Sequence, residues 1–71
     1  MNAAETIVPL LLSRSQAARL LGLSVPTVDR MQAAGKLPRT FKVNGSVKYR
    51  RDDLVRWIDQ GCPSRRDFEN E

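Results

Sequence analysis

Six lysine and arginine residues lie between positions 36 and 51, and no acidic residue interrupts them. A cationic run of this density attracts polyanions, because each contact with a phosphate neutralises charge and releases counterions. The segment that follows, residues 52–71, has the opposite balance, with six acids against three arginines. This asymmetry predicts a surface that faces a nucleic acid. The cationic residues are Lys36, Arg39, Lys42, Lys48, Arg50 and Arg51.

Catalytic and metal chemistry has little support. The 71 residues include no histidine and one cysteine, Cys62. The most common general base and metal ligand is therefore missing, and neither an internal disulfide nor a two-cysteine metal site can form. We expect no enzyme activity, no metal and no cofactor, and we interpret Cys62 as an inert thiol.

The longest apolar run, six residues from Ile7 to Leu12 with Pro9 inside it, is too short for a membrane span or a signal peptide. The expected location is cytoplasmic.

Two helix-start signals lie close together in the first half of the chain. Ser13 and Gln16 form a capping-box pattern ahead of a helix expected over residues 14–21, and Gly22 ends that helix. Ser24 begins a second helix, which is expected to end near residue 34. Only three residues separate the two helices, and so short a connection sets them at a steep angle. This is the helix-turn-helix pattern.

From residue 39 the apolar residues alternate with polar ones, and Asn44-Gly45 in the middle of the alternation is a strong hairpin signal. A two-residue loop would place Phe41 and Val43 on the opposite face from Val47 and Tyr49. We therefore expect a three-residue loop over residues 44–46, which pairs 43 with 47 and 41 with 49. All four apolar side chains then share one face, and Lys42, Lys48 and Arg50 share the polar face.

A third helix is predicted to begin at Asp52 and Asp53, which favour a helix N-terminus, and to end at Gly61. We expect a flexible N-terminus at residues 1–10, one folded domain at 11–61, and a C-terminal tail at 62–71 that forms at most a short turn of helix. The predicted core consists of Ala18, Leu21, Leu23, Val28, Met31, Leu37, Phe41, Val43, Val47, Tyr49, Leu54, Trp57 and Ile58.

The chain contains four characteristic segments, namely LLSRSQAARLLGLS from residue 11, TVDR from residue 27, GKLP from residue 35 and LVRWI from residue 54. Together they resemble the winged helix-turn-helix of AlpA-type phage regulators and excisionases. These proteins are small relatives of the MerR DNA-binding domain. The resemblance covers about residues 11–61. It implies a mainly α fold with a small β-hairpin, in the order α-α-β-β-α. It also implies that the second helix enters the major groove of DNA while the hairpin, or wing, contacts the backbone.

MerR regulators proper continue into a long dimerisation helix and an effector domain. Only ten residues follow Gly61 here, so the resemblance is to the DNA-binding part alone. We expect no small-molecule effector, and a protein that is monomeric in free solution.

The second helix supplies most of the candidate base contacts. Arg30 is suited to bidentate binding of guanine, Gln32 to an adenine edge and Asp29 to a cytosine edge. Ser24 and Thr27 are candidates for phosphate binding, although Ser24 serves equally well as a helix N-cap. The predicted DNA contacts are Ser24, Pro26, Thr27, Asp29, Arg30 and Gln32 on the second helix, Arg14 and Ser15 on the first, and Lys36, Arg39, Lys42, Lys48, Arg50 and Arg51 on the wing and its flanks.

Each of these candidates has a structural alternative. Arg30 is also typical of a solvated helix surface, and lysines on a hairpin protect an exposed strand edge from aggregation. The aromatic residues Phe41, Tyr49 and Trp57 could stack on bases, but their inward periodicity favours core packing.

The sequence therefore predicts a sequence-specific double-stranded DNA-binding protein that acts as a small transcriptional regulator, bacterial or phage-encoded and associated with the nucleoid. An excisionase-type recombination directionality factor is the alternative within this class. A module that contacts a polymerase or recombinase is the alternative from another class, and salt dependence distinguishes it because only DNA binding must weaken steeply with salt. The expected partners are double-stranded DNA and further copies of the chain on adjacent sites, or an integrase or RNA polymerase, with no membrane.

Overall fold

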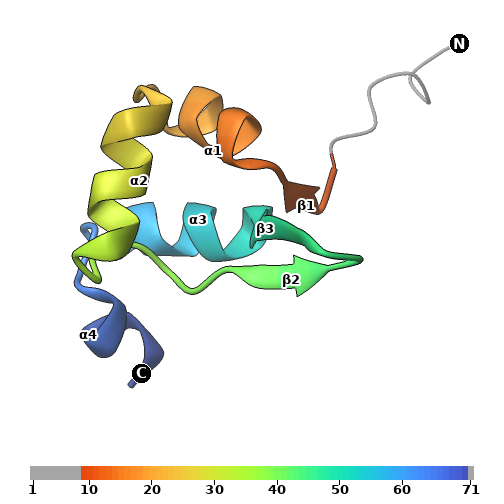
Figure 1. Ribbon diagram of the computed structural model, residues 1–71. Coiled ribbons are helices and arrows are strands. Elements are labelled where there is room, and N and C mark those ends of the chain that lie inside the picture. The colour runs from red at the N-terminus through yellow and green to blue at the C-terminus, as the bar shows by residue number, and fades with distance from the viewer. Residues whose placement is uncertain (1–8, 71) are drawn as a thin grey trace, which may run out of the picture.

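A computed structural model describes residues 9–70 of the protein (Figure 1). The elements in chain order are β1 (Leu11–Leu12), α1 (Arg14–Leu21), α2 (Val25–Ala33), β2 (Phe41–Val43), β3 (Ser46–Arg50), α3 (Arg51–Asp59) and α4 (Arg65–Glu69). The predicted fold class is confirmed, because the domain is mainly helical with a short antiparallel sheet. Two elements, β1 and α4, are additional to the predicted order. Most of the N-terminal segment expected to be flexible lies outside the described residues.

Helices α1 and α2 begin and end where the local signals placed them. The Ser13 hydroxyl accepts a hydrogen bond from the Gln16 backbone N–H at 3.2 Å, and the Gln16 side chain accepts one from the Ser13 N–H at 2.9 Å, so the capping box is complete. Gly22 ends α1 with φ at +74°, a left-handed conformation that glycine adopts without a Cβ clash. Ala17 and Ala18 are buried, and their small side chains let α1 and α2 pack closely.

The hairpin register differs from the prediction. The strands pair Phe41 with Lys48 and Val43 with Ser46, so the loop has two residues rather than three. Asn44 and Gly45 both have positive φ, at +55° and +83°, as a tight hairpin turn requires. The intrinsic preference of Asn-Gly for this turn therefore outweighed the gain from placing all the apolar side chains on one face.

The one-residue change in register separates the side chains of the sheet into two different sets. Strand β1 pairs Leu12 with Tyr49 and extends the sheet to the order β1-β3-β2. Because directly opposed residues point to the same side, the face that carries Leu12 and Tyr49 also carries Val47 and Lys42; we call it the inner face. The outer face carries Leu11, Phe41, Val43, Ser46, Lys48 and Arg50. The expected common polar face of Lys42, Lys48 and Arg50 is therefore wrong.

The core combines residues from all four helices and from β1 and β3. It consists of Leu12, Ala17, Ala18, Val28, Leu37, Tyr49, Leu54, Trp57 and Phe68. Six of these were predicted, and Leu21 and Met31 pack against them half-buried. Four predicted core residues are instead exposed by more than a third, namely Leu23, Val43, Val47 and Ile58. The two valines lie near the tip of the hairpin, Leu23 lies in the turn between α1 and α2, and Ile58 lies beside the buried stripe of α3.

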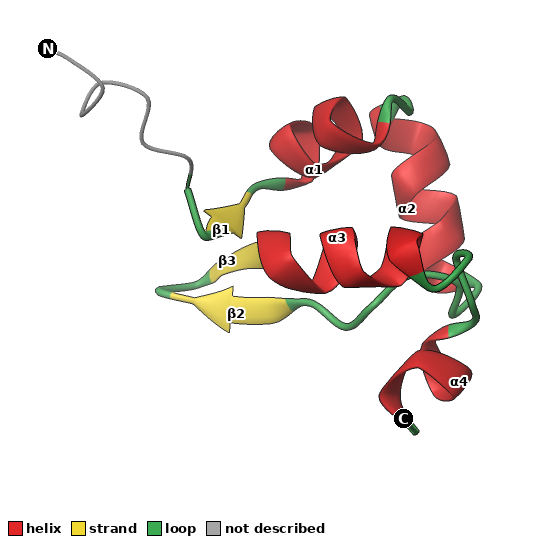
Figure 2. Cartoon of the chain, turned by 180° about the vertical axis from the view of Figure 1, so that it is seen from behind, coloured by secondary structure: helices red, strands yellow, loops and turns green. Residues whose placement is uncertain are grey.

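The C-terminal segment is more than a polar tail. Ser64 caps α4 by accepting a hydrogen bond from the Asp67 N–H at 3.2 Å, and Phe68 on that helix is only 5% exposed. Seen from behind, α4 lies beyond the C-terminal end of α3, on the side away from α1 (Figure 2). At most a turn of helix was predicted here from the sequence, without the contribution of Phe68 to the core.

Candidate functional site

Two hydroxyl groups at the start of α2 meet a guanidinium group from its last turn. Ser24 caps the helix, since its Oγ accepts a hydrogen bond from the Thr27 N–H at 3.3 Å. The Ser24 hydroxyl and the Arg30 Nη2 both donate to the Thr27 Oγ1, at 2.8 and 3.3 Å. These two bonds use both acceptor positions of the Thr27 hydroxyl and leave its hydrogen to donate outward. Ser24 is thus occupied as a cap, and Thr27 is the better placed of the two to donate to a phosphate. Pro26 is exposed on the same turn.

An ion pair joins the first turn of α1 to the middle of α2. The Arg14 Nη1 lies 2.8 Å from the Asp29 Oδ2, and both side chains are about half exposed. Pairs this exposed contribute at most about 1 kcal/mol to stability, but this one fixes the direction of the Asp29 carboxylate. Arg14 and Asp29 were both candidate DNA contacts, and the structure places them side by side at the junction of the two helices, with Ser15 exposed beside them.

Gln32 faces the interior rather than the outer surface of α2. Its Nε2 donates to the Pro38 carbonyl at 3.2 Å and to the Tyr49 hydroxyl at 3.0 Å. Both amide hydrogens are therefore used within the protein. The expected contact of Gln32 with an adenine edge is not supported by this placement, and Gln32 instead joins α2 to β3.

Tyr49 gives this contact a measurable pH dependence. Burial raises the pKa of the Tyr49 phenol above its ordinary value of about 10, an effect that the Gln32 hydrogen bond partly offsets. Folding therefore favours the neutral phenol, and this contribution is complete below pH ~10 and lost as the pH rises through the folded-state pKa. We expect the free energy of unfolding to fall between pH 9 and 11 more steeply in the native protein than in Tyr49→Phe, as measured by urea titration.

The phenylalanine variant is a clean control because Tyr49 is the single tyrosine of the chain. Equal losses of stability with pH in the two proteins would contradict the assignment of Tyr49 as a buried neutral phenol.

The three lysines of the cationic run have no ion-pair partner among residues 9–70. Lys36 is exposed in the connection after α2, and Lys42 is exposed on the inner face of the hairpin near its tip. Lys48 is half-buried beside Phe41 on the outer face. The hairpin tip extends away from the helices (Figure 1). Because Lys42 and Lys48 lie on opposite faces, the hairpin carries a cation on each face.

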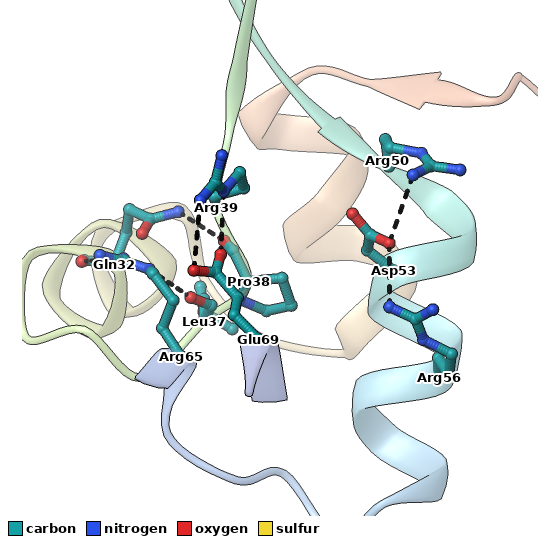
Figure 3. A network of polar contacts seen from close by, with 9 residues as sticks. All are labelled: Gln32, Leu37, Pro38, Arg39, Arg50, Asp53, Arg56, Arg65 and Glu69. Carbon is teal, nitrogen blue, oxygen red and sulfur yellow. Dashed lines mark hydrogen bonds and ion pairs between the residues drawn. The ribbon is translucent and has the colours of Figure 1, made fainter. Parts of the chain in front are cut away.

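The three arginines of the run, in contrast, are paired with acids that follow the run in the sequence. Figure 3 shows two of these pairs, at Arg39 and Arg50. Arg39 makes a two-point contact with Glu69, at 3.0 Å from Nε and 3.3 Å from Nη2. This hydrogen bond raises the pKa of Arg39 and lowers the pKa of Glu69. Arg50 lies 3.7 Å from Asp53, and Arg51 lies 3.3 Å from Asp52.

Asp53 is the buried carboxylate of this region. Its Oδ1 lies between Arg50 and Arg56, at 3.5 Å from the Arg56 Nη2. Together with Arg39, Phe41 and Phe68, these residues line an open groove of about 360 Å³. Its three arginines and two acids leave a formal charge of +1. Folding therefore pairs the arginines of the cationic run with acids and leaves its lysines without an ion-pair partner among residues 9–70.

Sequence reasoning missed Arg65 and Glu69, both of which contact the predicted site from α4. Glu69 holds Arg39, and the Arg65 guanidinium donates to backbone carbonyls of Gln32 and Leu37. A signal for α4 was present, because Ser64 followed three residues later by Asp67 is a helix-start pattern and Phe68 supplies an apolar residue for packing.

Within the described part of the chain, no three histidine, cysteine or acidic side chains cluster as metal ligands would. None of its helices is long and apolar enough to cross a membrane.

A family model described as a helix-turn-helix domain matches residues 11–62. The matched segment begins at β1, includes α1, α2, the hairpin and α3, and stops before α4. No curated protein matches the chain.

Proposed function

The chain belongs to the helix-turn-helix domain family, which implies DNA binding. We propose that it is a sequence-specific transcriptional regulator. In this proposal, α2 lies in the major groove and the β2–β3 hairpin contacts the phosphate backbone. The observation that carries the proposal is the separation of the cations into two groups. Arg30 on α2, and the lysines at positions 36, 42 and 48, have no carboxylate partner within residues 9–70. Among the predicted cationic DNA contacts, these are the groups available to an incoming polyanion.

The two elements have different roles in this proposal. Arg30 is oriented by its hydrogen bond to Thr27, and a guanidinium held in this way suits the O6 and N7 acceptors of guanine. Thr27, whose hydroxyl hydrogen is not used by these two bonds, binds a phosphate next to the base that Arg30 contacts. The lysines bind phosphates without regard to sequence. Arg39, Arg50 and Arg51 contribute less, because each would first have to leave its carboxylate.

The first experiment selects binding sites from random duplexes with the wild-type protein and measures affinity for the selected and a scrambled duplex. Arg30→Ala should lose about 1–3 kcal/mol of binding free energy on the selected duplex, because one bidentate base contact is lost. Its affinity for the scrambled duplex should fall far less. Arg19→Ala is the matched control, since it removes the same charge from an exposed position on α1 and should preserve the ratio of the two affinities.

An unchanged ratio in Arg30→Ala would mean that α2 does not recognise bases through this residue. A wild-type protein whose affinity does not weaken with salt would contradict DNA binding altogether and favour a protein partner.

The regulatory role has its own test, a footprint on the DNA around the gene. Protection upstream of a promoter supports regulation, whereas protection confined to a recombination attachment site would assign the protein to recombination instead.

A further inference from the structure

We propose that α4, which lies beyond the matched family segment, positions the recognition helix α2 relative to the hairpin and thereby sets how sharply the protein distinguishes DNA sequences. This inference rests on the proposed function and deepens it, because it adds Arg65 as a positioning residue. Arg65 acts through α2 and is not itself a DNA contact.

Arg65 binds the last turn of α2 and the connection after it at three points. Its Nη2 donates to the Gln32 carbonyl and its Nε to the Leu37 carbonyl, both at 2.8 Å, and its backbone N–H donates to the Gly35 carbonyl at 2.9 Å. The two guanidinium bonds use the planar fork of arginine to join the last turn of α2 to the connection that leads into β2 (Figure 3). A cation at the C-terminal end of a helix also interacts favourably with the helix dipole.

Gln32 of α2 is also held through its side chain. The Gln32 side chain donates to the Pro38 carbonyl and to the Tyr49 hydroxyl, so Gln32 is fixed through its backbone by α4 and through its side chain by β3. Arg30 lies two residues earlier on the same helix. A bidentate base contact tolerates little displacement, and the orientation of Arg30 therefore depends on how firmly this end of α2 is held.

The rest of α4 anchors it to the hairpin and to α3. Glu69 makes its two-point contact with Arg39 just ahead of β2. Phe68 is buried in the core, and the Arg56 guanidinium of α3 lies 4.8 Å from the centre of its ring. The helix thus contacts α2, the start of the hairpin and α3 together, which are the elements whose relative placement the proposed DNA complex requires.

The test compares the wild type with Arg65→Ala, Arg65→Lys and the matched control Arg66→Ala. Arg66 is the next residue on α4, carries the same charge and is exposed, and its side chain makes no hydrogen bond among residues 9–70. The first measurement is amide hydrogen exchange at the C-terminal end of α2, without DNA. The second is the ratio of affinities for the selected and scrambled duplexes over a range of salt concentrations.

We expect faster exchange at the end of α2 in Arg65→Ala than in Arg66→Ala, and a selected-to-scrambled ratio that falls about five- to tenfold only in Arg65→Ala. Arg65→Lys keeps the charge but cannot bridge both carbonyls, so its ratio should fall as well, by a smaller factor. Arg65→Lys replaces Arg65→Ala in both measurements if the alanine variant does not fold.

Three results would overturn the proposal. The first is equal exchange in the Arg65 and Arg66 variants, and the second is an unchanged ratio in both folded Arg65 variants. The third is a salt slope shallower by about 0.9 with the ratio intact, which would make Arg65 a direct phosphate contact. A wild-type protein that selects no duplex would instead contradict the proposed function, and the exchange experiment would still decide whether Arg65 holds α2.

Discussion

Trp57→Ala is expected to unfold the domain. The indole is 3% exposed in the core and its Nε1 donates to the Pro63 carbonyl at 2.7 Å. Removing a buried tryptophan costs about 3–5 kcal/mol, while a domain of this size has roughly 4–10 kcal/mol in total, at 0.05–0.15 kcal/mol per residue. Thermal unfolding followed by far-ultraviolet circular dichroism should show loss of the cooperative transition or a large fall in Tm.

Two variants of the same helix separate the contributions. Trp57→Phe keeps most of the apolar contact but loses the bond to Pro63, and should lie between the alanine variant and the wild type. Val55→Ala removes a side chain that is 46% exposed and should change stability by no more than about 0.5 kcal/mol. A Trp57→Ala protein that melts within a few degrees of the wild type would show that the indole is not part of the core.

The second large effect is expected on DNA affinity when the three unpaired lysines are neutralised together. Each phosphate contact contributes about 0.9 to the slope of log affinity against log salt. Relative to 1 M salt, one contact therefore contributes about 0.9 decade of affinity at 0.1 M salt. The combined variant Lys36→Gln, Lys42→Gln and Lys48→Gln should therefore bind selected and scrambled duplexes about 500-fold more weakly, with a slope shallower by about 2.7.

The charge-preserving variant Lys36→Arg, Lys42→Arg and Lys48→Arg is the control and should bind nearly as tightly as the wild type. If the glutamine variant keeps the wild-type slope, the lysines do not contact phosphates. The arginines at positions 39, 50 and 51 would then have exchanged their carboxylates for the DNA backbone.

The helix-turn-helix was predictable because its signals are local. Ser13 with Gln16, Gly22 and Ser24 each act within one turn of the chain, and each formed the cap that its residue type predicts. The hairpin register was not predictable from alternation alone, because two local preferences conflicted there. The turn preference of Asn44-Gly45 prevailed, since Val43 at the tip has little to pack against and gains little by turning inward.

The candidate site was predictable as a set of cations but not as an electrostatic surface. Asp53 is one turn from Arg50 along the chain, whereas Glu69 reaches Arg39 only because α4 folds back onto the domain. The position of α4 depends on the burial of Phe68 and on the bonds from Arg65 to distant carbonyls, and no periodicity within the segment encodes those contacts. For the same reason, Gln32 matched a base contact by residue type and yet faces Tyr49.

In the proposed DNA complex, the two-residue turn also determines which phosphates the wing can reach. With Lys42 and Lys48 on opposite faces, the hairpin is a ribbon with positive charge on both sides, whereas the three-residue loop would have placed both lysines on one side. A one-sided ribbon lies flat along a single strand of the duplex. A two-sided ribbon in the proposed complex is instead suited to standing edge-on between the two sugar-phosphate walls of a groove, with one lysine directed at each wall.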